Sequence, residues 1–225
     1  MSGPAVVLVH GFATSAARTW GDNGWIDLLG DAGREVVAID LLGHGTADKP
    51  HDPAAYAEVE SLVAAQLPDG PIDAIGFSMG ARVLLTIAAE QPDRFERLVV
   101  AGVGANLFRQ DPRDDIVQAI GGDAAHDNPA AQYFAGLARQ PGNDAEALVA
   151  FMRSPRPPLD DGRLAKITCP VLVVLGDRDF AGPADPLVGA LTNATLVTLP
   201  GVDHFATPKD FGFIDAALDF LGASF

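Results

Sequence analysis

One serine stands between two glycines in the pentapeptide GFSMG, residues 76–80. An apolar run precedes it and a helix-like sequence, residues 81–89, follows at once. A strand that turns abruptly into a helix strains its corner residue, and glycines leave room there because they have no Cβ. The free N–H groups of the following helix favour negative charge. The pattern predicts that Ser78 is a nucleophile and that the backbone N–H of Met79 stabilises the oxyanion it creates.

A serine hydroxyl is too weak an acid to attack unaided, so it needs a base, usually a histidine oriented by a carboxylate. In a strand–turn–helix arrangement of this kind the base follows the acid along the chain. Two histidines follow Ser78, and His204 lies directly after the last apolar run, in LPGVDHFATP. We therefore predict that His204 is the base, and that His126, in GGDAAHDNP, is a solvated turn residue.

The orienting acid is expected in the segment LGDRDFAGP, which offers Asp177 and Asp179. We favour Asp179, because two residues beyond the turn the loop can swing back over the edge of the sheet. Asp177 remains the alternative, and its other interpretation is a carboxylate that bonds nearby backbone N–H groups, as aspartates do in turns.

A second oxyanion donor is expected from the loop after the first apolar run, VLVHGFATS. Gly11 lets the backbone approach the nucleophile closely, which makes the N–H of Phe12 the candidate. His10 is expected to support this loop through hydrogen bonds rather than to act as an acid or a base.

Six short runs rich in Val, Ile and Leu must position these residues, and they cover residues 5–11, 34–43, 71–78, 97–104, 170–177 and 194–201. The runs are nearly continuous rather than alternating, which is typical of parallel strands covered on both faces. Helical stretches between them are expected at residues 25–32, 54–66, 79–91, 185–191 and 211–221. This alternation predicts an α/β fold, with an open, doubly wound, mostly parallel sheet of about six strands and helices on both faces.

One segment, residues 105–167, interrupts the strand pattern after the fourth run. It contains helical pieces at residues 114–120, 130–139 and 144–152, and we predict a short helical lid within a single domain that spans residues 1–225. Its apolar side chains are expected either to line an acyl pocket or to form the core of the lid. The predicted pocket residues are Phe108, Tyr133, Phe134, Phe151 and Met152, together with Phe205.

Composition excludes several classes of function. The formal net charge of −15 would repel nucleic acid and anionic membrane surfaces. No apolar run reaches 18 residues, and the N-terminal sequence has no basic segment followed by a cleavage site, so neither a membrane span nor a secretory signal is expected. The lone Cys169 fits a buried thiol in a reducing cytoplasm. The spacings typical of metal and nucleotide sites are missing, so we expect no metal and no cofactor.

Five motifs together resemble the α/β-hydrolase fold family: HGF (10–12), GHGTADKP (43–50), GFSMG, GDRD (176–179) and GVDHF (201–205). The resemblance implies a triad of Ser78, Asp179 and His204, with the amides of Phe12 and Met79 as the oxyanion hole. It also supports Asp179, because the acid of the family commonly lies three residues after the glycine that ends the strand.

The chain departs from the family pattern in several places. It starts almost at a strand that members usually reach after two earlier ones, its lid is shorter than the helical cap common in the family, and Ala47 stands where serine is frequent. Because the nucleophile is a serine and not an aspartate, the haloalkane dehalogenases and epoxide hydrolases of this fold are poor matches.

These residues lead to an expected function. We expect a serine hydrolase that acts on a small or medium carboxylic ester, or on a related thioester, lactone or C–C acyl bond, through an acyl-enzyme on Ser78. Two alternatives remain, because the fold does not decide the chemistry. One is a non-hydrolytic enzyme such as a lyase, a perhydrolase or a cofactor-free oxygenase, and the other is a ligand receptor with slow turnover.

Overall fold

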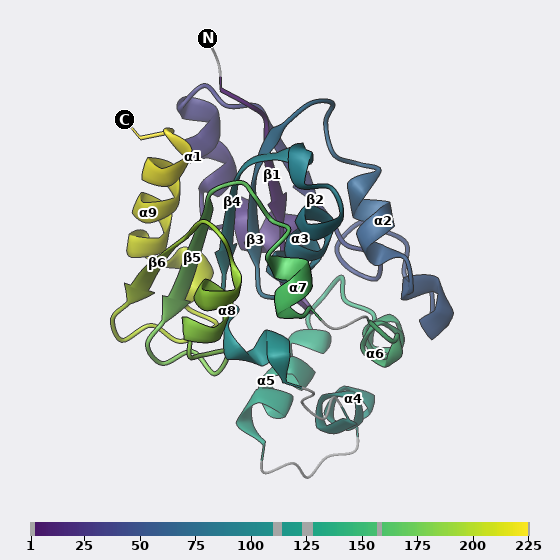
Figure 1. Ribbon diagram of the computed structural model, residues 1–225. Helices are drawn as coiled ribbons and strands as arrows, with labels where there is room; N and C mark the ends of the chain where they lie inside the picture. The colour runs from purple at the N-terminus through teal and green to yellow at the C-terminus, as the bar shows by residue number, and fades with distance from the viewer. Residues whose placement is uncertain (1–2, 110–113, 123–127, 157–158, 225) are drawn as a thin grey trace.

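The sheet at the centre of the molecule has six strands, all parallel (Figure 1). The computed structural model describes residues 3–109, 114–122, 128–156 and 159–224. The spatial order is β2-β1-β3-β4-β5-β6. The strands are β1 (Val6–Val9), β2 (Val36–Ile39), β3 (Ile72–Phe77), β4 (Phe95–Ala101), β5 (Val171–Gly176) and β6 (Ala194–Leu199). The predicted fold class is confirmed, and no antiparallel strand occurs in the described part of the chain.

Helices cover both faces of this sheet and form two separate cores. Helices α1 (Trp25–Asp31) and α9 (Phe211–Leu221) pack on one face. The other face carries α2 (Val59–Ala64), α3 (Met79–Glu90), α7 (Asp161–Leu164) and α8 (Asp185–Ala190). Along β1, Val6 and Leu8 join the first core while Val7 and Val9 join the second. Successive side chains of a strand point to opposite faces, which explains why the predicted strands were continuously apolar.

Most predicted helices begin and end within two residues of the observed ones. The main difference lies at residues 54–66, where a short 3₁₀ turn (η2, Pro53–Tyr56) precedes α2. Asp52 starts this turn because its side chain accepts from the N–H of Ala54, and the Tyr56 hydroxyl anchors it by donating to the carbonyl of Pro50. A π-helical turn, η1 (Ala17–Gly21), was not predicted.

Three helices between β4 and β5 lie beyond the carboxyl ends of the strands (Figure 1). They are α4 (Asp114–Gly121), α5 (Pro129–Ala138) and α6 (Ala145–Arg153), close to the predicted positions. This is the segment predicted as a lid, and that role and the division into domains stay predictions. His126 lies outside the described residues.

Candidate active site

The corner between β3 and α3 holds Ser78 in strained backbone geometry, with φ 53° and ψ −111°. A Cβ on Gly80 would stand 2.1 Å from the carbonyl oxygen of Val9, and one on Gly76 would stand 2.6 Å from the Cα of Ala81. Both glycines are therefore required for α3 to lie this close to the strands. The N–H of Ser78 donates to the carbonyl of Ala101 at 2.8 Å, which fixes the corner against β4.

Ser78, His204 and Asp179 form one chain of hydrogen bonds. The Oγ of Ser78 lies 3.0 Å from Nε2 of His204, and Nδ1 of His204 lies 2.9 Å from both carboxylate oxygens of Asp179. Asp179 also accepts from the N–H of Ala181 at 2.8 Å. Because Asp179 accepts at Nδ1–H, Nε2 carries the free lone pair and can accept the proton of Ser78. Asp179 and His204 are buried, while Ser78 is half-buried.

Asp177, the alternative acid, is placed elsewhere by the fold. Its side chain is exposed, and Oδ1 accepts from the N–H of Gly201 at 2.7 Å. It is thus a carboxylate that closes a loop through a backbone N–H. The geometry brings Asp179, and not Asp177, to His204.

The loop after β1 brings its backbone beside Ser78. A Cβ on Gly11 would lie 3.0 Å from the ring of Phe77 and 3.5 Å from the Cβ of Ser78, so the absence of a side chain lets this loop pass close to the nucleophile. Neither the N–H of Phe12 nor that of Met79 has a protein acceptor among the described residues. Both are consequently available to a bound group.

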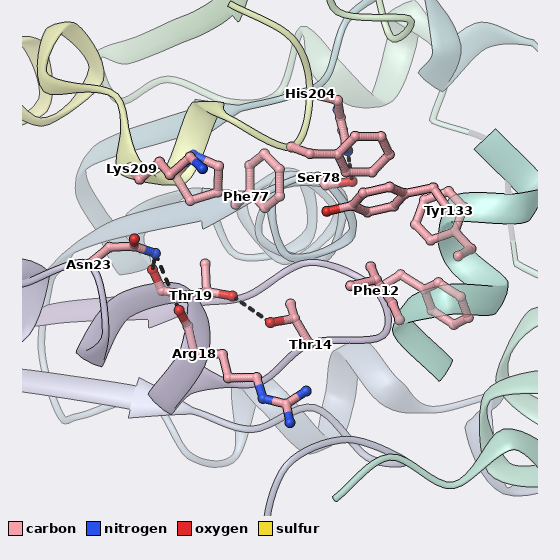
Figure 2. Close-up of a pocket in the computed structure, with 14 residues that line it drawn as sticks. Phe12, Thr14, Arg18, Thr19, Asn23, Phe77, Ser78, Tyr133, His204 and Lys209 are labelled. Carbon is pink, nitrogen blue, oxygen red and sulfur yellow. Dashed lines mark hydrogen bonds between the residues drawn. The ribbon is translucent and has the colours of Figure 1, made fainter. Parts of the chain in front are cut away.

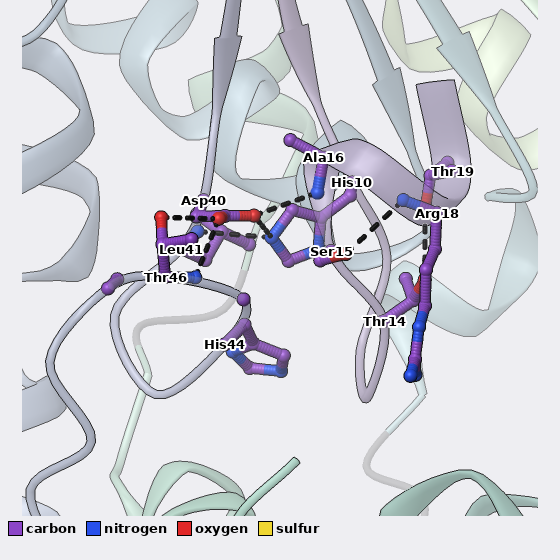
Figure 3. A network of polar contacts seen from close by, with 12 residues as sticks. His10, Thr14, Ser15, Ala16, Arg18, Thr19, Asp40, Leu41, His44 and Thr46 are labelled. Atoms are coloured by element: carbon purple, nitrogen blue, oxygen red, sulfur yellow. Dashed lines mark hydrogen bonds and ion pairs between the residues drawn. The ribbon is translucent and has the colours of Figure 1, made fainter. Parts of the chain in front are cut away.

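His10 holds this loop in place (Figure 3). Its Nδ1–H donates to the carbonyl of Gly11 at 2.7 Å, and Nε2 accepts from the N–H of Leu41 at 3.1 Å. Burial lowers the pKa of His10, although the carbonyl of Gly11 and the nearby carboxylate of Asp40 oppose the shift. The imidazole is therefore neutral and its tautomer is fixed, which agrees with a supporting role.

Asp40 ties the loop after β1 to the loop after β2 (Figure 3). One oxygen accepts from the N–H of Ala16 at 2.8 Å, and the other accepts from the N–H and the hydroxyl of Thr46 at 2.8 and 2.9 Å. Burial raises the pKa of Asp40, but these hydrogen bonds outweigh it, so the pKa lies below its ordinary value. Sequence reasoning missed this residue, which carries no motif of its own.

A cavity of about 140 Å³ opens beside Ser78 and His204 (Figure 2). Its lining residues differ in chemistry. The apolar and aromatic ones are Phe12, Phe77, Tyr133, Phe134, Leu137 and Phe205. The polar lining residues other than the triad, which we call the polar wall, are Thr14, Arg18, Thr19, Asn23 and Lys209.

Three of the six predicted pocket residues, Tyr133, Phe134 and Phe205, line this cavity. The other three do not. Phe151 is fully buried behind Phe12, with ring centroids 5.8 Å apart, and Met152 packs half-buried against the same core. Phe108 is 36% exposed at the end of the short turn η4 (Ala105–Phe108) that follows β4. The apolar character of Phe151 indicated correctly that this side chain is buried. It did not indicate that Phe151 lies behind Phe12 instead of lining the cavity.

The polar wall was missed altogether. Thr14, Arg18 and Thr19 come from the loop after β1 and from η1, while Lys209 belongs to the turn η5 (Thr207–Lys209) after His204. The available signal was the run FATSAART, which is richer in hydroxyl groups than a simple connection requires.

The described residues contain neither a metal-binding cluster nor a helix that could span a membrane. No group of three or more His, Cys, Asp and Glu side chains has the arrangement to hold a metal ion. Within the same residues, no helix has the length and hydropathy needed to cross a bilayer.

Residues 6–215 match the family model described as the alpha/beta hydrolase family. The pimeloyl-[acyl-carrier protein] methyl ester esterase of Neisseria meningitidis serogroup B is 32% identical over 237 residues, covering 88% of this chain and 85% of that protein. A haloalkane dehalogenase of Mycolicibacterium paratuberculosis is 39% identical over 108 residues, or 45% of this chain and 34% of that protein. The chain thus spans about a third of the length of several curated relatives.

A solved structure, the enol-lactonase from Burkholderia xenovorans LB400, superposes with a TM-score of 0.70 at 19% identity. The superposition covers 99% of this chain and 92% of that one. At this identity the likeness concerns the fold alone.

Proposed function

The chain belongs to the alpha/beta hydrolase family and is an esterase-like hydrolase, and from that premise we propose that it cleaves a small carboxylic ester through an acyl-enzyme on Ser78. One observation carries the proposal. Ser78, His204 and Asp179 are joined by hydrogen bonds of 2.9 to 3.0 Å, and the serine faces a cavity. Residues 105–167 serve as the lid of a single domain, and the expected partner is a small acyl substrate.

The proposed mechanism follows from the donors and acceptors of the site. Nε2 of His204 takes the proton of Ser78 as Oγ attacks the ester carbonyl, and Asp179 stabilises the imidazolium that forms. The N–H groups of Phe12 and Met79 receive the developing oxyanion, each contributing about 2.7–4 kcal/mol. His204 then returns the proton to the departing alcohol, and a water molecule activated by His204 hydrolyses the acyl-enzyme.

The size of the cavity supports a short substrate. A volume of about 140 Å³ is close to that of a cavity known to hold benzene, roughly 150 Å³. The Neisseria relative is named as a methyl ester esterase, which supports an ester with a small alcohol. We therefore favour small esters over medium ones.

Covalent labelling tests the proposal. A fluorophosphonate should add one label to the wild-type protein, at Ser78, and p-nitrophenyl acetate should give a burst of nitrophenol. Ser78→Ala should lose the label, the burst and nearly all turnover, with an unchanged circular dichroism spectrum. A labelled residue other than Ser78, or an active Ser78→Ala protein, would overturn the mechanism.

A further inference from the structure

The polar wall of the cavity carries positive charge in a strongly acidic protein. The chain has 30 Asp and Glu against 15 Lys and Arg, yet the cavity lining includes Arg18 and Lys209. Among the described residues that line it, there is no Asp or Glu. A net charge of −15 disfavours an anion near most of the surface. Apart from the imidazole of His204, the ionisable basic side chains that line the cavity, Arg18 and Lys209, therefore carry the opposite sign to the net charge of the chain.

Arg18 is held firmly without being neutralised. Nη1 donates to Oε1 of Gln140 at 2.8 Å, and Nη2 donates to the carbonyl of Pro141 at 2.5 Å. Both acceptors are uncharged, and a guanidinium has five N–H donors, so donors remain. Within the described chain, neither Arg18 nor Lys209 forms an ion pair with a carboxylate.

Hydrogen bonds also hold the uncharged members of the polar wall (Figure 2). The hydroxyls of Thr14 and Thr19 lie 3.2 Å apart, and Nδ2 of Asn23 donates to the carbonyls of Arg18 and Thr19 at 3.2 and 2.9 Å. Asn23 and Lys209 lie across the view from Phe12 and Tyr133. A substrate that reaches from Ser78 across the cavity would therefore meet hydrogen-bond donors and positive charge.

We propose that the polar wall, through Arg18 and Lys209, binds a second, anionic carboxylate of the substrate, so that the preferred substrates are monoesters of short dicarboxylic acids. The inference rests on the proposed function and deepens it. A carboxylate suits donors of this kind because charge-assisted hydrogen bonds to arginine and lysine are the strong ones. A few carbons between the two carbonyl groups suit a cavity of about 140 Å³.

An alternative explanation is that Arg18 has a structural role only and anchors η1, through its hydrogen bonds to Gln140 and Pro141, to the segment after α5. The two explanations differ in how they treat charge. Loss of a structural contact should change kcat/KM by the same factor for all substrates, whereas loss of an anion site should lower kcat/KM selectively for the anionic substrate.

The test compares monomethyl glutarate with methyl pentanoate, a neutral ester of similar length, by kcat/KM for methanol release at pH 8. The wild-type enzyme should prefer monomethyl glutarate by about 10- to 100-fold, the range expected for hydrogen bonds to a charged group. Arg18→Gln and Lys209→Gln should each lower this ratio, and the double variant should bring it close to one. Arg94→Gln is the matched control, because Arg94 also donates to a backbone carbonyl, that of Pro68, but does not line the cavity.

A wild-type ratio near one, or an Arg18→Gln/Lys209→Gln variant with the wild-type ratio, would overturn the anion site. If Ser78 is nevertheless labelled and methyl pentanoate is hydrolysed, the proposed function stands while this inference fails. If neither ester is hydrolysed and Ser78 is not labelled, the proposed function fails. Calorimetric binding of both esters to Ser78→Ala decides the anion site in that case, because tighter binding of monomethyl glutarate supports it and equal or weaker binding refutes it.

Discussion

Two buried aspartates, at opposite ends of the sheet, have different kinds of partner. Asp179, beyond the carboxyl end of β5, faces His204 and the N–H of Ala181. Asp73, near the amino end of β3, is fully buried and pairs with Arg34, while Arg97 lies 3.6 Å away. One carboxylate holds a ring that can gain and lose a proton, and the other holds permanent charges.

The partners explain what each carboxylate can do. Arg34 also donates to the carbonyls of Pro4 and Leu221, so Asp73 joins the start of the chain, β3 and the end of α9. Burial raises the pKa of Asp73 in spite of the two guanidinium groups. A buried ion pair of this kind contributes little net stability, but removing one partner is costly. A buried acid with a titratable partner is therefore a candidate for chemistry, while one with fixed cations is a structural element.

The largest effect is expected at Asp179. Asp179→Asn should lower kcat by about 10⁴-fold, because the imidazole loses the acceptor that fixes its tautomer. The free energy of unfolding, measured in urea, should change far less than in the Asp73 variant described next. Asp177→Asn serves as the control and should lower kcat much less, because the Asp177 carboxylate accepts from the N–H of Gly201 and does not contact His204 among the described residues. A reversed order of the two variants would identify Asp177 as the acid.

Asp73→Asn should show the opposite pattern. It leaves Arg34 buried without a carboxylate, so the free energy of unfolding should fall by about 3–5 kcal/mol. At temperatures where the variant stays folded, kcat should equal that of the wild type, because Asp73 lies at the other end of the sheet. Esterase assays at 15 °C, combined with urea melts, check both statements. An Asp73→Asn variant with unchanged stability and a reduced kcat would contradict the structural role assigned to Asp73.

His44 extends the comparison to a buried histidine that has no carboxylate partner in the described part of the chain. Nδ1–H donates to the carbonyl of Leu42, Nε2 has no partner among the described residues, and burial lowers the pKa to about 3. His10 and Arg156 lower it further, while Asp40 opposes the shift.

The folded-state pKa of His44 is depressed below the unfolded value of about 6.5, so the unfolded chain binds the proton first as the pH falls. Stability should therefore decline by about 2 kcal/mol between pH 7 and pH 5 from this residue alone. Urea melts of the wild type and of His44→Leu across this range check the prediction. A slope that is equal in both proteins would show that His44 is not responsible.

The smallest effect on stability is expected at an exposed ion pair between His51 and Asp144. Nε2 of His51 lies 3.0 Å from Asp144 and Nδ1 lies 3.0 Å from Glu146, which links the loop before η2 to the start of α6. The hydrogen bond to Asp144 raises the pKa of His51, and the same bond lowers the pKa of Asp144.

The stability that His51 contributes is complete below its unfolded pKa of about 6.5 and is lost as the pH rises through the higher pKa of the folded state. The stability that Asp144 contributes is present above its unfolded pKa of about 3.9 and is lost as the pH falls through the lower pKa of the folded state. Hydrogen exchange at the amides of α6 should therefore be faster in His51→Ala than in the wild type at pH 5.5, and equal in both at pH 9. A difference that persists unchanged at pH 9 would contradict the ion pair.

The residues at the nucleophile corner were predictable because their determinants are local. GFSMG stands between a strand pattern and a helix pattern, and both glycines are required by contacts within that corner. Asp179 and His204 were predictable from a topological rule, since the ends of parallel strands meet at one edge of the sheet. The geometry of all three agrees with the prediction, while their roles in chemistry await the tests above.

The walls of the cavity were not predictable to the same degree. Phe151 and Phe134 have the same apolar character, yet one is packed behind Phe12 and the other faces the cavity. Arg18 and Lys209 lie far apart in the chain, and no periodic pattern links them. The polar wall takes its charged side chains from a π-helical turn and a 3₁₀ turn, and neither turn has a sequence signal as strong as a strand.

The position of β1 between β2 and β3 has a consequence for the protein as it is synthesised. Of the six strands in the described part of the chain, β1 leaves the ribosome first, yet it lies inside the sheet and cannot be paired on both sides until β3, ending at Phe77, has also emerged. Ser78 follows immediately, but Asp179 and then His204 are added much later. A nascent chain that already holds a folded corner around Ser78 therefore lacks the base that the proposed mechanism needs. If the proposed mechanism holds, ester hydrolysis begins only when β6 and the segment carrying His204 are free to dock.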